Sequence, residues 1–395
     1  MGTVLLVGGL SLAIYPIVLY PLMLWFGTRL RRRPRSSVRQ VPESGPEDWP
    51  PVSITVPVYN EAHQIESLLE SLVTLEYPAD RRQILIVSDG STDGTDEMVR
   101  QWEERGVELL TVEGRGGKGA AENAAREHLT GKIIVNTDAS IRIRPDALLH
   151  LMRPFEDPSI GVVSGRDVSV IRHGADANTG EGGYVGYEMK IRDLETHTGG
   201  IVGASGCLYA SRKHLHDQGV PPRLSRDFAS ALVARDRGYR AVSAPRAVCF
   251  VPRTGSLQKE YRRKVRTVAR GMSTVWAWKH LMNPIKHPGF AWKLLSHKIF
   301  RWLLPVALLM IGLGLVFLSP DSSLATFALV GCAAAVLLGL IGWGMGRDER
   351  SLPMVLSVPA FFLMSNVAVV HAFVRACGRG SEALWEPTRR KSGST

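Results

Sequence analysis

The stretch QILIVSDGSTDGT occupies residues 83–95. It begins with an apolar run that ends on Asp89, and glycine, serine and threonine follow that aspartate. A short apolar run bounded by turn residues is typical of a buried strand. Similar runs are VSITVPV, VELLTV, KIIVNTD and GVVSGRD, which begin at residues 52, 107, 132 and 161. Helical stretches separate these runs between Pro51 and Pro252, so we expect an α/β fold on a mainly parallel sheet.

Polar residues stand where these strands end. Tyr59 and Glu61 follow the first strand, and Asp89 ends the second. Asp138 ends the fourth strand. Ligands of open α/β sheets bind outside the carboxyl ends of the strands, so the sequence predicts a ligand site at this edge.

The ends of the chain are apolar, although the 395 residues carry a formal net charge of +11. Segments without charged residues, about the length that a membrane span requires, occupy residues 3–26, 302–318, 324–346 and 352–374. No small-residue cleavage site follows the first segment, so we expect a retained anchor. The sequence therefore predicts a multi-pass protein of the cell membrane.

Arginines directly follow the first segment, in TRLRRRPRSSVR at residues 28–39. Lys and Arg beside a span stay in the cytoplasm, so we expect the middle region to be cytosolic. Four spans would then place the basic tail outside, against the same rule. Either the last segment, interrupted by Pro353 and Pro359, is re-entrant, or the number of spans differs from four.

The expected organisation has six parts. They are an N-terminal anchor (1–28), a basic cytosolic linker (29–50), an α/β domain (51–255), basic amphipathic interface helices (256–298), C-terminal transmembrane segments (299–375) and a tail (376–395).

The stretch GRGGKG, residues 114–119, allows two interpretations. It satisfies the G-x-G-x-x-G fingerprint of dinucleotide-binding folds, which makes a membrane NAD-dependent dehydrogenase one alternative. However, it follows the third strand, and Lys118 stands where backbone amides should meet a pyrophosphate almost unaided. We therefore interpret Lys118 as a cation aimed at a diphosphate.

The motifs VPVYNE (56–61), VSDGSTDGT (87–95) and TDAS (137–140) resemble those of family-2 glycosyltransferases of the polysaccharide-synthase kind, which are inverting enzymes with a GT-A fold. The resemblance extends over roughly residues 50–280. It implies a base and ribose pocket and a lysine-bearing diphosphate loop. The donor-binding residues that it implies are Pro57, Tyr59, Glu61, Asp89, Lys118 and Asp138.

The resemblance also implies a metal site, because the family holds Mg²⁺ or Mn²⁺ with an acidic D-x-D triplet at the end of this strand. This chain has Asp138, Ala139 and Ser140 instead. One carboxylate, several waters and two phosphate oxygens can still complete an octahedral Mg²⁺ shell. Ser140 either contributes to that shell or caps the turn that follows.

The catalytic base is expected in LSRDFASALVARDRGYRAV, residues 224–242, which matches the place of an acidic pair in the family. Arg226 replaces the first acid and Asp227 is kept. Inverting transfer needs a carboxylate that accepts the proton of the acceptor hydroxyl, and Asp227 is the candidate. Arg226 would keep that carboxylate ionised if it pointed inward, but it could equally point to solvent.

Acceptor-side residues are expected in two further segments. GGYVGYEMKIRDLE, residues 182–195, supplies Tyr184, Tyr187 and Glu188, which are either acceptor contacts or ordinary helix content. The basic segment 256–278 lacks the Q-x-x-R-W motif of processive relatives. Its candidates for the diphosphate are Arg262, Arg263 and Arg266, and a helix lying on anionic lipid is the other interpretation.

These patterns predict a metal-dependent family-2 hexosyl- or N-acetylhexosaminyl-transferase. The expected donor is a nucleoside-diphosphate sugar, with UDP as its nucleotide, and the expected acceptor is a polysaccharide or a lipid-linked glycan. A catalytically silent sugar-nucleotide-binding subunit of a synthase complex is a further alternative. Because the basic residues cluster near the spans, the lipid bilayer is the expected partner and nucleic acid is not.

Overall fold

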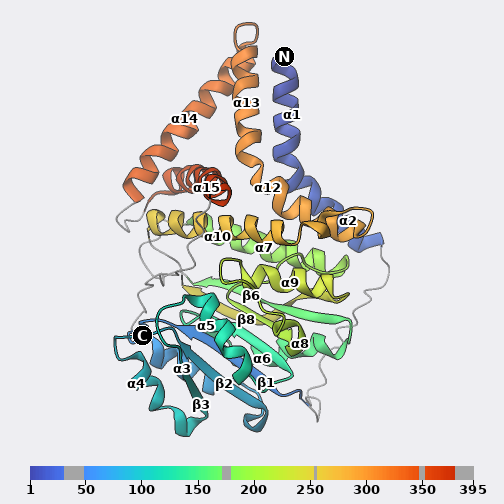
Figure 1. Cartoon of the computed structure of the whole chain (residues 1–395). Coiled ribbons are helices and arrows are strands. Elements are labelled where there is room, and N and C mark those ends of the chain that lie inside the picture. Colours follow the sequence, from blue (N-terminus) through green and yellow to red (C-terminus); the bar gives the residue numbers. More distant parts are fainter. Residues whose placement is uncertain (31–48, 171–178, 253–255, 347–351, 379–395) are drawn as a thin grey trace. The chain divides into compact units, whose positions relative to one another are not determined.

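A computed structural model describes residues 1–30, 49–170, 179–252, 256–346 and 352–378 of the chain (Figure 1). The chain divides into two compact units. The helical unit comprises residues 1–32, 171–187 and 254–380, and the sheet unit comprises residues 33–170, 188–253 and 381–395. Helix α7 (Thr179–His197) crosses this division, since Tyr187 belongs to the helical unit and Glu188 to the sheet unit.

The sheet unit is built on an eight-stranded sheet in the order β3-β2-β1-β4-β7-β6-β8-β5. Its strands are β1 (Val52–Val58), β2 (Arg82–Ser88), β3 (Val107–Thr111), β4 (Ile133–Thr137), β5 (Arg142–Ile143), β6 (Ile160–Val170), β7 (Leu208–Arg212) and β8 (Arg240–Pro252). The half made by β3, β2, β1 and β4 is parallel. β7 lies antiparallel between β4 and β6, so the sheet as a whole is mixed.

Helices cover both faces of the parallel half. They include α3 (Ile65–Val73), α4 (Thr95–Arg100) and α5 (Lys118–Ala125), while α6 (Ala147–Met152) packs on β6 and β8, and α8 (Lys213–His216) and α9 (Arg226–Asp236) follow β7. On one face Ile54 and Ile84 pack in a core with Leu68 of α3. On the other face Leu85 and Ala121 belong to a second core. Strands buried on both faces explain why these segments are continuous apolar runs.

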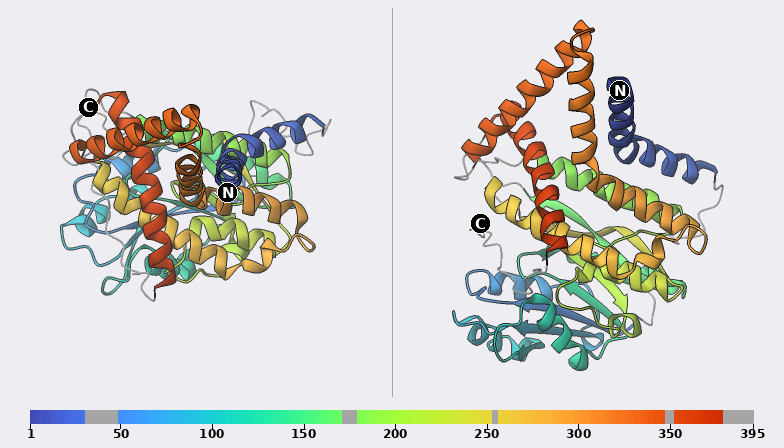
Figure 2. Two further views of the ribbon diagram at one scale, coloured as in Figure 1. Left: turned by 90° about the horizontal axis from the view of Figure 1, so that it is seen from above. Right: turned by 45° about the horizontal axis from the view of Figure 1, so that its top comes forward.

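The helical unit holds the apolar ends of the chain (Figure 2). Its elements are α1 (Gly2–Ile14), the π-helical turn η1 (Tyr15–Leu19), α2 (Tyr20–Leu30), α10 (Leu257–Ala277), α11 (Pro288–Leu294), the π-helical turn η7 (Leu295–Ile299), α12 (Phe300–Trp302), α13 (Leu304–Leu318), α14 (Ser323–Met345) and α15 (Met354–Cys377). α1 packs closely on α13. At Gly314 of α13 the approach is so close that a Cβ would lie only 2.6 Å from the backbone nitrogen of Leu6 in α1. Small residues permit such close helix packing in membranes.

Three helices of the described residues are long and apolar enough to cross a membrane, namely Gly2–Leu30, Ser323–Met345 and Met354–Cys377. A fourth is obtained only if Pro288–Trp302 and Leu304–Leu318, which meet at a bend of 55°, count as one span. The predicted segment 302–318 is therefore divided at Leu303. The predicted segment 352–374 is one helix that contains Pro359.

Candidate active site

The loops that follow β1 and β2 are bonded to each other. Asn60 has a φ of 53°, a left-handed conformation that asparagine tolerates better than most residues, and its Oδ1 accepts a hydrogen bond of 2.8 Å from the backbone of Thr92. The backbone N–H of Glu61 donates to the Thr95 hydroxyl over 2.9 Å. Thr92 and Thr95 therefore fix the backbone that carries the first donor motif.

Glu61 and Tyr59 are positioned by this locked loop. The Glu61 side chain is buried, and burial raises its pKa, as do the neighbouring carboxylates of Asp138 and Asp93. The Tyr59 ring carries the guanidinium of Arg115 at 4.1 Å from its centroid. An aromatic ring under a planar cation is a platform on which a base could stack.

Asp89 holds the glycine loop, because its two carboxylate oxygens accept hydrogen bonds from the backbone amides of Gly116 (2.9 Å) and Gly117 (2.8 Å). Gly117 has a φ of 83° directly before α5 begins at Lys118, which is a conformation that favours glycine. These are the amides that a dinucleotide pyrophosphate would need. Because Asp89 already accepts hydrogen bonds from these amides, they are not placed to bind a pyrophosphate, which argues against the dehydrogenase alternative. The other predicted donor residue of the neighbouring strand, Pro57, is buried within β1 opposite Val87.

Lys118 and Asp138 contact each other across the carboxyl ends of the strands. The Lys118 ammonium bonds to Oδ1 of Asp138 and lies 3.8 Å from Oε1 of Glu122, one helical turn along α5. Burial alone would lower the pKa of Lys118, but these two carboxylates outweigh it and raise the pKa. The lysine is therefore a fixed cation beside Asp138.

Arg226 points inward, but its partner is not Asp227. Its Nε lies 2.9 Å from Oε2 of Glu122, and its Nη2 bonds to the side-chain oxygen of Asn123. Arg226 is 8% exposed and Glu122 is 4% exposed, so the ion pair is buried. Glu122 therefore brings a carboxylate to Arg226 from α5, where the family motif would have led us to expect an acid at residue 226 itself.

Asp227 lies in the first turn of α9. Its Oδ1 accepts a hydrogen bond of 2.6 Å from the hydroxyl of Ser225. Its Oδ2 faces Gly206, where a Cβ would come within 3.0 Å of that oxygen. Ser225 thus orients the carboxylate, and the missing side chain at Gly206 leaves the second oxygen uncrowded on that side.

Sequence reasoning missed two residues of this cluster, Glu122 and Tyr209. A signal for Glu122 exists, since it stands four residues after Lys118 on a helix and so shares its face. Tyr209 of β7 is 3% exposed, and its hydroxyl has no hydrogen-bond partner among the described residues. Burial raises the pKa of Tyr209, and the nearby carboxylate of Glu122 raises it further.

The predicted acceptor-side tyrosines lie in the helical unit. The Tyr184 hydroxyl accepts a hydrogen bond of 2.8 Å from Arg301, and the Tyr187 hydroxyl donates over 3.0 Å to the carbonyl of Ile17. Glu188 lies in the sheet unit, with Oε1 at 3.7 Å from Nε of Arg192.

The predicted cations of α10 also belong to the helical unit. Arg263 is committed to Glu260 within α10, through bonds of 2.7 and 2.9 Å. Arg262 is exposed, and Arg266 is half-buried.

A divalent cation would have few protein ligands. Among the described residues, no group of three His, Cys, Asp or Glu side chains is placed to hold a metal ion. Asp138 and Ser140 lie in one turn, closed by a 3.0 Å hydrogen bond from the backbone of Ile141 to the Asp138 carbonyl. One carboxylate and one hydroxyl fit a hard cation that keeps waters and takes substrate phosphate as its other ligands.

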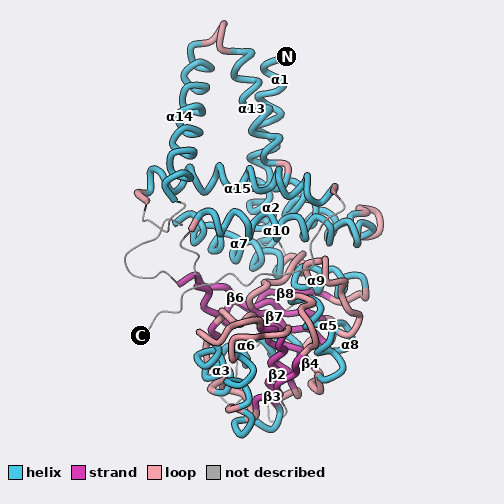
Figure 3. Tube along the Cα trace, turned by 60° about the vertical axis from the view of Figure 1, so that its left-hand side comes forward, coloured by secondary structure: helices cyan, strands magenta, loops and turns pink. Residues whose placement is uncertain are grey.

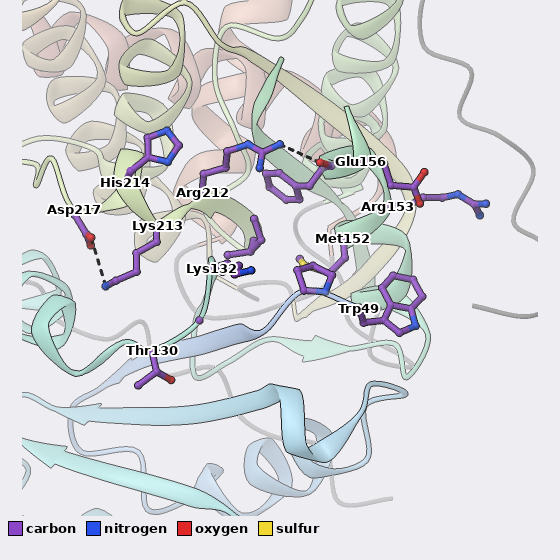
Figure 4. Close-up of a pocket in the computed structure, with 14 residues that line it drawn as sticks. Trp49, Thr130, Lys132, Met152, Arg153, Glu156, Arg212, Lys213, His214 and Asp217 are labelled. Carbon is purple, nitrogen blue, oxygen red and sulfur yellow. Dashed lines mark hydrogen bonds and ion pairs between the residues drawn. The ribbon is translucent and has the colours of Figure 1, made fainter. Parts of the chain in front are cut away.

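A pocket of about 730 Å³ lies at the opposite edge of the sheet, where β1 and β4 begin (Figure 4). Arg212 in its wall donates to the carbonyls of Ile160 and Phe155. Lys213 pairs with Asp217 at 3.4 Å. These contacts give both cations a structural role, and the carboxyl edge remains the candidate site.

Residues 53–215 match the model of Glycosyl transferase family 2. The chain contains a glycosyl transferase family 2 domain. The matched residues include Glu61, Asp89, Lys118 and Asp138, and the resemblance inferred from the sequence motifs is confirmed.

Among curated relatives of the family-2 domain, a beta-monoglucosyldiacylglycerol synthase of Nostoc sp. is 32% identical over 34% of this chain and 29% of its own length. A poly-beta-1,6-N-acetyl-D-glucosamine synthase of Staphylococcus aureus is 27% identical over 58% of this chain and 57% of its own length. The chain thus covers less than two thirds of these relatives.

A solved structure resembles almost the whole chain. It is a mannosyltransferase of Pyrobaculum calidifontis, solved in complex with GDP-Man and Mn²⁺. Its TM-score is 0.70 at 24% identity, over 94% of this chain and 99% of that one. The likeness confirms the predicted α/β fold of the GT-A type.

Proposed function

We propose that the protein is a membrane-attached inverting glycosyltransferase that moves a sugar from a nucleoside-diphosphate sugar to a polysaccharide or lipid-linked acceptor. The observation that carries the proposal is the cluster at the carboxyl edge of the family-2 domain. There Lys118 contacts Asp138 and lies within electrostatic range of Asp227. A cation for a diphosphate and a carboxylate for a hydroxyl proton are the two groups that such a transfer needs.

The donor side is proposed to lie between the Tyr59 ring and Lys118. The buried Glu61 and the ring of Tyr59 offer hydrogen-bonding and stacking partners for a nucleoside. Lys118 is proposed to exchange its bond to Asp138 for one to the donor diphosphate. Its high pKa keeps it charged for this purpose.

In the proposed transfer, an acceptor oxygen attacks C1 of the sugar from the face opposite the diphosphate. The C1–O bond to the diphosphate breaks, and the hydroxyl proton passes to the carboxylate of Asp227. The hydrogen bond from Ser225 holds one oxygen of Asp227, so the other, beside Gly206, is the proposed proton acceptor.

Asp138 and Ser140 are the residues that would hold Mg²⁺ or Mn²⁺. The cation would supply positive charge to the leaving diphosphate. The Mn²⁺ of the Pyrobaculum mannosyltransferase complex supports this part of the proposal. A diphosphate held by Lys118 and a divalent cation could belong to either UDP or GDP. UDP is the nucleotide that the sequence motifs favour.

The decisive experiment replaces Asp227 with asparagine, which keeps the size of the side chain but cannot accept the proton. We expect turnover to fall by about 10²–10⁴ while donor affinity and melting temperature stay near those of the natural protein. Asp236→Asn, an exposed position on the same helix, serves as the control. Transfer at the natural rate by the Asp227 variant would place the base elsewhere.

Ligand binding is tested separately, by thermal shift of the purified full chain in detergent. UDP or GDP with Mn²⁺ should raise the melting temperature, and NAD should not. Stabilisation by NAD alone would revive the dehydrogenase alternative. Stabilisation by a nucleoside diphosphate without any transfer to a screened panel of acceptors would favour the silent subunit.

A further inference from the structure

The last described helix, α15, packs along α10 by one face. Two apolar clusters join the helices. The first contains Leu257 of α10 with Ala360 and Met364 of α15, and the second contains Val265 and Ala269 of α10 with Ala368 and Ala372 of α15. Beside the second cluster the Tyr261 hydroxyl and Nδ1 of His371 are 2.8 Å apart. The two helices therefore run side by side over several turns.

The partner helix α10 is strongly cationic. Its charged residues are Lys259, Glu260, Arg262, Arg263, Lys264, Arg266 and Arg270. Such a helix cannot enter the hydrocarbon core of a bilayer without burying several charges, but it can lie at the headgroups with its cations toward anionic lipid. Because α15 lies beside α10 along this length, the two helices would share one depth in a membrane.

The remaining surface of α15 is apolar and exposed. It includes Val355, Val358, Phe362, Val370, Phe373 and Val374, which are between 43% and 67% exposed. Figures 1 and 3 show α15 running crosswise to α1 and α13, within the same unit. An exposed apolar face on a helix that is held beside a cationic one fits the boundary between headgroups and acyl chains.

We propose that α15, although long and apolar enough to span, lies in the membrane interface beside α10 and does not cross. The inference rests on the membrane attachment proposed above. The chain then crosses with Gly2–Leu30, with α14, and with the bent pair Pro288–Trp302 and Leu304–Leu318 counted as one span. The tail after Cys377 returns to the side that holds the arginine-rich linker and the family-2 domain.

This arrangement removes the conflict in the sequence, where four spans put a basic tail outside. The tail carries Arg379, Arg389, Arg390 and Lys391, and the linker carries a dense run of arginines. With α15 in the interface, both basic segments lie on one side, as the distribution of Lys and Arg around spans requires.

The side of the tail can be tested by cysteine labelling of the full chain in sealed vesicles of both orientations. In a variant with its four natural cysteines replaced, single cysteines are introduced as Ser36→Cys in the linker, Asp321→Cys between α13 and α14, and Ser394→Cys in the tail. We expect a membrane-impermeant maleimide to label the linker and tail cysteines from one side and Asp321→Cys from the other.

Labelling of Ser394→Cys together with Asp321→Cys would overturn the inference and restore a spanning α15. Labelling of all three cysteines from one side would also overturn the inference, because Asp321 would then not be separated from the linker and the tail by spans; if the protein were in addition lost from the membrane fraction, the membrane attachment would be refuted as well. Retention of the labelled protein in the membrane fraction separates these two failures.

The depth of α15 gives an independent test. Phe362→Cys and Phe373→Cys stand eleven residues apart, about 16 Å along a helix, and both positions are exposed. A fluorophore at either site should be quenched equally by lipids brominated near the headgroup. The control pair, Val330→Cys and Ile341→Cys on α14, has the same spacing and should show unequal quenching. Unequal quenching on α15 would overturn the proposal.

Discussion

Glu122 pairs with two cations, the buried Arg226 and the half-buried Lys118, and its replacement by glutamine is the most informative test of how the site is built. The Glu122 carboxylate lies 2.9 Å from Nε of Arg226 and 3.8 Å from the Lys118 ammonium. Glutamine keeps the shape and removes the charge. Arg226 is then left with Asn123 as its described side-chain partner, in a position that is 8% exposed.

Breaking a buried ion pair from one side destabilises a protein by about 3–5 kcal/mol, because the remaining charge stays buried. For a unit of this size, each kcal/mol lowers the melting temperature by about 2–4 °C. Glu122→Gln should therefore lower the midpoint by about 6–20 °C. Arg226→Met should have a smaller effect, because Glu122 retains Lys118 as a counter-charge.

The assay is thermal unfolding of the detergent-purified full chain, followed by tryptophan fluorescence for both single variants and the double variant. Glu97→Gln is the control, since Glu97 pairs with Arg100 at 3.7 Å on the surface and should contribute less than about 1 kcal/mol. An unchanged midpoint in Glu122→Gln, or a larger loss in Arg226→Met, would refute the reasoning.

Three further predictions use the same protein. Lys118→Ala should weaken binding of UDP by about 10–100-fold, because it removes one hydrogen bond to a charged phosphate group. Uridine has no phosphate, so its binding should stay unchanged. Equal losses for both ligands would indicate misfolding. Gly206→Ala should lower turnover about tenfold with donor affinity kept, because its Cβ would crowd Asp227, whereas Gly183→Ala has no neighbour within 4 Å and should be neutral. Burial, with the nearby guanidinium of Arg226, lowers the pKa of His216 from 6.5 to about 3. The folded state therefore loses stability as pH falls from about 6.5 toward 3, by about 2 kcal/mol at pH 5. His216→Leu should shrink the difference in melting temperature between pH 7.5 and pH 5, and an unchanged difference would contradict this cause.

The sequence by itself determined five of the eight strands and the family of the domain that they form, while β5, β7 and β8 are not among the apolar runs from which we predicted strands. Apolar runs bounded by turn residues appear as β1, β2, β3, β4 and β6. The runs of β1 and β4 are buried along their whole length, as strands covered on both faces require. Tyr59, Asp89 and Asp138 also lie where their strands end, since a short motif fixes its own local backbone. The candidate membrane spans follow from the length of each segment and from its lack of charged residues, which are local properties as well.

Only the tertiary structure shows which side chains and backbone groups the site residues contact. Asp89 accepts the amides of the glycine loop, and Arg226 finds Glu122 rather than Asp227. These contacts join residues that are far apart in the sequence, so no local pattern encodes them. The position of α15 has the same origin. Its composition permits a span, and in the proposed arrangement the cationic helix α10, which the fold packs against it, sets the depth at which it lies.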